Sequence, residues 1–203
     1  MTTHRIESLS DCIFAFSMTL LVMNFTFPSA GPVINEKQAT ELFLKEVSKF
    51  DRYALTFVLL AIFWITHHQQ FHHIKRTDRS FLWIQIAILM AIVMVPFTAA
   101  WMSAYNHLRI TNLIFDANLL ILGFLFLLSW LYATHAGRLV DENLDRKSVT
   151  RGIARSLLTC VVALIAMAAS FYHPGWSNYA FILTPLLLLS KPFRQVKSSR
   201  TKP

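Results

Sequence analysis

The sequence lacks the short motifs that mark the commonest classes of enzyme. It contains no GxSxG nucleophile turn and no Walker phosphate loop, and its carboxylates form no pair at a plausible catalytic site. The only two cysteines, Cys12 and Cys160, both lie inside apolar runs, which excludes a disulfide framework. We therefore expect a protein that is not an enzyme and whose fold does not depend on disulfides.

Charged residues are also scarce. They make up 15% of the chain, whereas 55% of the residues are hydrophobic and the mean hydropathy is +0.47. This composition is too apolar for an ordinary soluble domain and is typical of a polytopic membrane protein. The net charge of +8 comes from basic residues between the apolar segments and in the tail 191–203, where they act as topology determinants. We expect a lipid bilayer, and not nucleic acid, as the partner.

Six apolar segments are candidates for crossing a bilayer, which takes about 20 mainly apolar residues. They are roughly residues 8–27, 53–73, 81–104, 111–134, 153–172 and 176–190. Residues 31–52 differ, because four acids and four bases alternate there with apolar side chains. That pattern predicts a charged, amphipathic segment outside the bilayer. The whole chain, residues 1–203, is thus expected to form one all-α membrane domain.

The distribution of lysine and arginine predicts the orientation. If the N-terminus lies inside, 14 of the 19 basic residues fall in inner segments and five in outer segments. The positive-inside rule therefore places both termini and the basic tail in the cytosol, and residues 31–52 on the opposite side.

Polar side chains recur at one depth in the first three spans. Asp11 lies about 9 Å beyond Arg5 at 1.5 Å per residue, and His67, His68 and Gln85 lie at a similar depth from the same membrane surface. Ionisable groups within a membrane normally face protein or water and have a partner. We expect an interhelical polar network, which either only holds the helices together or also helps to gate a pathway. Its expected members are Arg5, Ser10, Asp11, His67, His68, Trp83 and Gln85.

A second pattern runs along the first span. Phe16, Thr19, Leu20 and Met23 stand at i, i+3, i+4 and i+7, which places them in one stripe. The spacing alone leaves three interpretations open: contact with lipid, packing in the core, or the wall of a pore.

The stretch "WITHHQQFHH", residues 64–73, offers an alternative. His68 and His72 are at i and i+4 and could bind a metal or a haem iron. However, HExxH and CxxC are absent, and His72 and His73 fall at the expected membrane surface. We favour network and interfacial histidines and expect no metal or cofactor. A proton-coupled transporter using Asp11 with His67 or His68 is a further alternative, distinguished from a channel by substrate-dependent proton flux.

Several motifs then match a known pattern. "RIESLSD" at residues 5–11 fits Arg-x-x-x-Phe-Ser-Asp, with Leu9 replacing Phe, and "AFSMTLLV" follows it. "FWITHHQQF" fits Trp-x-x-His-His in the second span. "RTDRSFLWIQIAIL" and "VPFTAA" fit the third, with Gln85 where Asn is usual. Together they resemble the prokaryotic branch of the transmembrane protein 175 family, potassium channels related to the lysosomal potassium channel.

The resemblance implies a homotetramer with six transmembrane helices per subunit and a central pore lined by the four first helices. A ring of bulky aliphatic residues, five positions after the motif Asp, would form the constriction in place of a TVGYG carbonyl filter, which this sequence lacks. Here that position is Phe16, which departs from the usual Ile or Leu, and Thr19, Leu20 and Met23 would line the pore. The implied function is a potassium-permeable cation channel of the bacterial inner membrane, with Phe16 leaving a non-conducting homologue as an alternative.

Overall fold

The computed structural model describes residues 3–25, 35–105, 107–141, 144–172 and 180–188. Within these ranges the chain is helical and forms no β-strand. Five of its helical segments are long and apolar enough to cross a membrane: Thr3–Asn24, Glu36–His73, Arg79–Ala104, Arg109–Gly137 and Arg146–Tyr172. The expectation of an all-α membrane protein is confirmed, and the first five predicted spans correspond to these helices.

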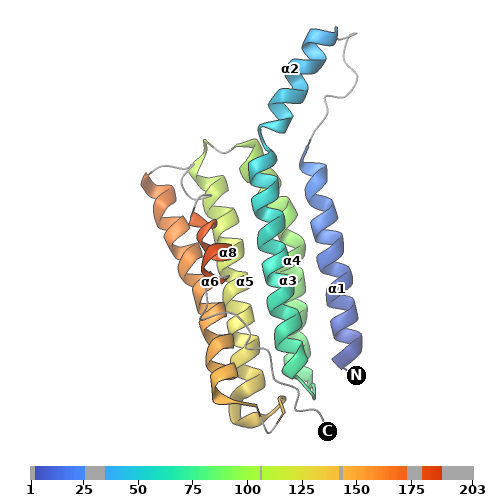
Figure 1. The fold of residues 1–203 in the computed structure, drawn as a ribbon, viewed down its shortest axis with the longest axis vertical. Helices are drawn as coiled ribbons and strands as arrows, with labels where there is room; N and C mark the ends of the chain where they lie inside the picture. Colours follow the sequence, from blue (N-terminus) through green and yellow to red (C-terminus); the bar gives the residue numbers. More distant parts are fainter. Residues whose placement is uncertain (1–2, 26–34, 106, 142–143, 173–179, 189–203) are drawn as a thin grey trace, which may run out of the picture.

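The sixth predicted span, 176–190, lies partly outside the described residues. What is described of it is α8 (Leu183–Leu188), a helix of six residues beside α6 (Figure 1). The basic tail 191–203 and residues 31–34 of the charged segment also lie outside the described ranges.

The long helices run antiparallel, each returning along its predecessor (Figure 1). α1 (Thr3–Leu20) continues as the 3-10 turn η1 (Leu21–Asn24) and packs on α3 (Phe50–His73) and α4 (Arg79–Ala104). α5 (Arg109–Thr134) packs extensively on α4 and on α6 (Arg146–Tyr172). The core between them is apolar and aromatic, with fully buried side chains that include Leu60, Ile88, Ile92, Leu122 and Phe126. α1 therefore lies at one edge of the bundle, attached through one face only.

The charged segment forms α2 (Glu36–Val47), which projects beyond the end of the bundle (Figure 1). Asn35 caps it with a reciprocal pair of hydrogen bonds to Gln38, a capping box that fixes where the helix begins. None of its side chains is buried, in agreement with the prediction of a charged helix apart from the core.

At the opposite end, a polar corner fixes the turn between α3 and α4. The Asp78 carboxylate caps α4 by accepting the Phe81 N–H at 2.8 Å, accepts the Tyr132 hydroxyl at 2.8 Å and lies 3.3 Å from the Arg138 guanidinium. Next to it, the Leu139 carbonyl accepts the backbone N–H of Lys75 at 2.8 Å. The Phe81 N–H, with help from Tyr132 and Arg138, holds the pKa of Asp78 below its usual value.

Candidate functional site: the free face of α1 and the inner polar layer

The first helix has two distinct faces. Ser10, Phe14, Ser17 and Leu21 are buried against α3 and α4. The opposite face is exposed, with Phe16 59% and Met23 71% accessible. The sequence pattern explains this division, because small or apolar residues at i, i+4, i+7 and i+11 fall on one side of a helix.

The stripe predicted from periodicity lies almost wholly on the exposed face. Phe16, Thr19 and Met23 are exposed, and Leu20 is half-buried at its edge. The Thr19 hydroxyl donates to the Phe16 carbonyl at 2.7 Å, so its polar atom is satisfied within the helix. Among the described residues of a single chain, Phe16 and Met23 thus lie outside the packed core. Phe16 and Met23 therefore face either lipid or the lumen of an assembly.

Two contacts nearer the N-terminus of α1 than this stripe join α1 to α3. The Trp64 indole N–H donates to the Asp11 carboxylate at 2.8 Å, and the Glu7 carboxylate lies 3.4 Å from His68 Nδ1. Glu7 and Asp11 are one turn apart on α1, as Trp64 and His68 are on α3, so the antiparallel helices pair them in order. These two contacts set the rotation of α1 about its own axis. They therefore also set the side of the helix bundle that Phe16 faces.

A separate, more deeply buried chain of hydrogen bonds joins α3, α4 and α5. His67 Nε2 lies 3.2 Å from Gln85 Oε1, and Gln85 Nε2 donates to the Ser129 hydroxyl at 2.8 Å. All three side chains are buried. Hydrogen bonds between polar side chains in a helical membrane core hold helices in register, which explains the presence of these residues between α3, α4 and α5.

The structure therefore corrects the expectation of one continuous network. Trp64 is the donor to Asp11, whereas Trp83 is 66% exposed on α4 and lies outside both groups. Ser10 donates to the Ile6 carbonyl of its own helix, and the Arg5 side chain is exposed. The contacts of Glu7, Trp64 and Ser129 were not predicted from the sequence. The i, i+4 spacing shared by Glu7–Asp11 and Trp64–His68 could have indicated the first two, but Ser129 gave no signal.

The metal interpretation finds no support in the described part of the chain. No group of three or more His, Cys, Asp or Glu side chains is placed to hold an ion there. His68 and His72 are both exposed.

Asp116 and Asn118 are buried on α5. The Asp116 carboxylate accepts the Ser170 hydroxyl of α6 at 3.2 Å, and the Asn118 amide lies 3.3 Å from the Thr98 hydroxyl of α4. These bonds link α5 to both neighbours, so the two residues serve packing.

Comparison with known proteins agrees with this arrangement. The family model described as "Endosomal/lysosomal potassium channel TMEM175" matches residues 5–96, which cover α1 to α4. A Streptomyces collinus protein named as a potassium channel is 24% identical over 189 residues, covering 91% of this chain and 85% of its own. A Chamaesiphon minutus protein, also named as a potassium channel, is 27% identical over 172 residues, covering 83% of this chain and 84% of its own.

The fold agrees as well. The crystal structure of a Chamaesiphon minutus homologue of the lysosomal potassium-selective channel TMEM175 superposes with a TM-score of 0.76 at 25% identity. The match covers 92% of this chain and 96% of that one. The family-model match, the relatives and the fold therefore all make this chain similar to proteins of the TMEM175 family.

Proposed function

We propose that this protein is a potassium-permeable cation channel whose pore is formed by four copies of α1. One observation carries the proposal. Phe16, Thr19 and Met23, the positions that the family resemblance assigns to the pore, lie on the face of α1 that the rest of the described chain leaves exposed. A pore lined by one helix per subunit requires several subunits around a symmetry axis, which supports a homotetramer.

Phe16 is the proposed constriction. Its side chain carries no group that could replace the water lost by a cation, so a ring of four controls flow through its width and its wetting. Thr19 and Leu20, one turn further along the helix, would line the wider part of the lumen. The Asp11–Trp64 and Glu7–His68 contacts hold each α1 against its own subunit, so a change in either would alter the diameter of the ring.

The alternative function, a proton-coupled transporter, requires Asp11 to exchange protons with a histidine. Asp11 instead accepts from the Trp64 indole, while His67 pairs with Gln85. The geometry thus favours a positioning role for Asp11. The Lys and Arg distribution supports a cytosolic location of both termini, and the bacterial relatives support the inner membrane.

Ion flux from liposomes tests the proposal. We expect potassium efflux driven by the potassium gradient alone, with slower sodium efflux and no dependence on a co-substrate. Proton flux that requires a co-transported substrate would support the transporter instead. A well-assembled protein that passes neither ion would show a non-conducting homologue.

A further inference from the structure

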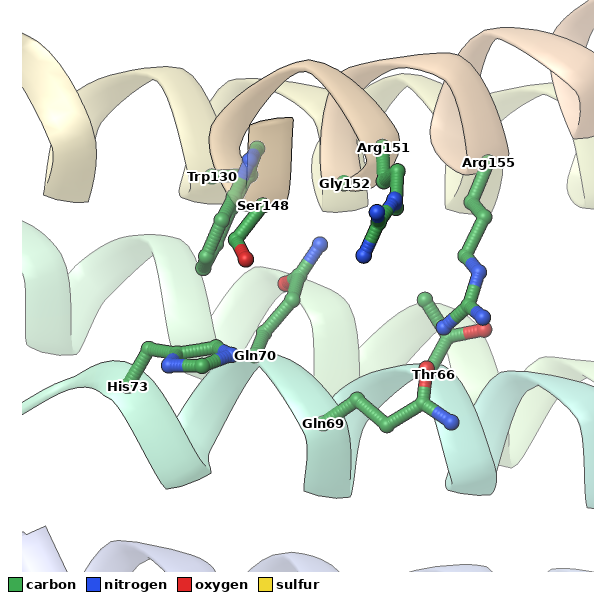
Figure 2. Close-up of a pocket in the computed structure, with 9 residues that line it drawn as sticks. All are labelled: Thr66, Gln69, Gln70, His73, Trp130, Ser148, Arg151, Gly152 and Arg155. Atoms are coloured by element: carbon green, nitrogen blue, oxygen red, sulfur yellow. The ribbon is translucent and has the colours of Figure 1, made fainter. Parts of the chain in front are cut away.

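A pocket unrelated to α1 lies between α3, α5 and α6, at the end of the bundle where the Lys and Arg distribution predicts the cytosol. Its volume is about 70 Å³. Since about 10–15 Å³ of such space holds one water molecule, the pocket is large enough for a small polyatomic group. Figure 2 shows its nine lining residues, which come from facing turns of α3 and α6, with Trp130 of α5 beside Ser148 at one end.

The pocket is built for negative charge. Arg151 and Arg155 extend from α6 across the pocket toward α3 (Figure 2). Both are half-buried, and none of the nine lining residues carries a carboxylate. Two cationic side chains beside one small space give it a positive potential, which attracts an anion. The planar guanidinium, with its fork of N–H donors, suits the oxygen atoms of phosphate in particular.

Neutral donors complete the lining. The Ser148 hydroxyl and the Gln69 amide lie at the edge of the same space (Figure 2). Ser148 is in the first turn of α6, where the helix dipole also favours an anion. The pocket therefore combines two cationic groups with uncharged hydrogen-bond donors, the usual composition of a phosphate site.

Trp130 forms one wall of the pocket, and two contacts with α6 hold its indole in place. The Trp130 indole donates to the Val149 carbonyl at 3.0 Å, which ties α5 to the first turn of α6. Gly152 lies against the same ring, and a Cβ added there would overlap the indole nitrogen. The close approach of Trp130 to the α6 backbone thus depends on glycine at position 152.

The depth of the pocket matches that of lipid head groups. Residues 156–172 of α6 carry no charged side chain and span about 26 Å, close to the roughly 30 Å of the hydrocarbon core. Arg155 and Arg151 precede this stretch and so fall at its boundary, where lipid phosphates lie. Basic pockets between transmembrane helices on the cytosolic side are a recurring form of anionic lipid site.

We propose that the pocket between α3 and α6 binds the phosphate group of an anion, supplied by the head group of an anionic phospholipid. The site is independent of the pore, so it can be tested without measuring conduction.

Thermal unfolding of the purified full-length protein in detergent provides the test. Short-chain phosphatidylglycerol is the probe, with short-chain phosphatidylcholine and inorganic phosphate as separate arms. We expect phosphatidylglycerol to raise the unfolding midpoint of the wild type in a saturable way, and phosphatidylcholine to have little effect. Saturation by inorganic phosphate alone would support the phosphate site but assign it to a soluble ligand.

The variant Arg151→Gln/Arg155→Gln should lose this shift. The matched control is Arg146→Gln/Lys147→Gln, which removes the same charge from exposed positions at the start of α6 and should keep the shift. If the double pocket variant does not fold, Arg151→Gln alone should move the half-saturating lipid concentration at least several-fold upward. An equal response of pocket and control variants, or equal stabilisation by phosphatidylcholine, would overturn the proposal.

Discussion

At the scale of single residues, Phe16 departs most from what the family resemblance implies. Four Phe rings around one axis occupy more area than four Ile side chains, so the rings either swing aside or leave the neck closed and dry. The exposed setting of Phe16 leaves its rotamer unconstrained by the core of its own subunit.

Phe16→Ala should therefore widen and wet the neck. We expect potassium flux to rise and discrimination between potassium and sodium to fall, both measured in liposomes. Met18→Ala is the matched control, because Met18 lies on the same helix but packs partly against the core. Equal effects of the two substitutions in assembled protein would show that the constriction lies elsewhere.

The Asp11–Trp64 hydrogen bond is a second feature at this scale. Bonds to a charged group contribute about 1.5–3 kcal/mol when well formed. A double-mutant cycle with Asp11→Ala and Trp64→Phe should give a coupling of about 0.5–3 kcal/mol in unfolding free energy. The same cycle with Trp83→Phe should be additive within about 0.5 kcal/mol. Coupling to Trp83 and not to Trp64 would contradict the geometry.

At the scale of elements, the Asp78 corner links α4 to α5 and to the following turn. Because the pKa of Asp78 is lower in the folded protein, its contribution to stability is fully present above the unfolded pKa of about 3.9. The contribution is lost as the pH falls through the lower folded pKa.

Lowering the pH from 5 to 3 should therefore reduce the unfolding midpoint of the wild type more than that of Asp78→Asn. The variant should also be less stable at pH 5, since it loses the ion pair with Arg138. Asp145→Asn, at an exposed carboxylate just before α6, should retain the wild-type response. A pH response that Asp78→Asn leaves unchanged would assign the acid sensitivity to other groups.

The helices themselves were largely predictable from the sequence, because long apolar runs bounded by basic residues admit few alternatives. α4 and α5 begin at Arg79 and Arg109, two residues before the predicted spans 81–104 and 111–134, and end where those spans end. The partner of Asp11 was not predictable in the same way. Counted from Ile74 and Arg79, Trp64 lies about 15 Å and Trp83 about 6 Å deep, so neither matches the depth of about 9 Å counted for Asp11. The rotation of each helix decides which indole faces α1. That rotation is set by core contacts such as Phe14 and Ile88, which depth counting ignores.

At the scale of the whole molecule, assembly is the decisive property. We expect a stable tetramer in mild detergent, measured by light scattering, with Phe16 close to the symmetry axis. Phe16→Cys should form disulfides between subunits in a Cys12→Ser background, because Cys12 is exposed and would otherwise compete. Met90→Cys, an equally exposed site on α4, serves as the control that should not cross-link if α4 faces away from the axis. A monomer would contradict a pore shared between subunits.

The near-continuity of α2 and α3 has a mechanical consequence. Only Ser48 and Lys49 separate them, and the bonds Ser48 N–H to Leu44 and Tyr53 N–H to Lys49 carry the helical path through the junction. α2 and α3 are therefore mechanically coupled although they differ in direction (Figure 1). A displacement of α2 would shift α3, and the Trp64–Asp11 bond would carry part of that shift to α1, the helix of the proposed pore.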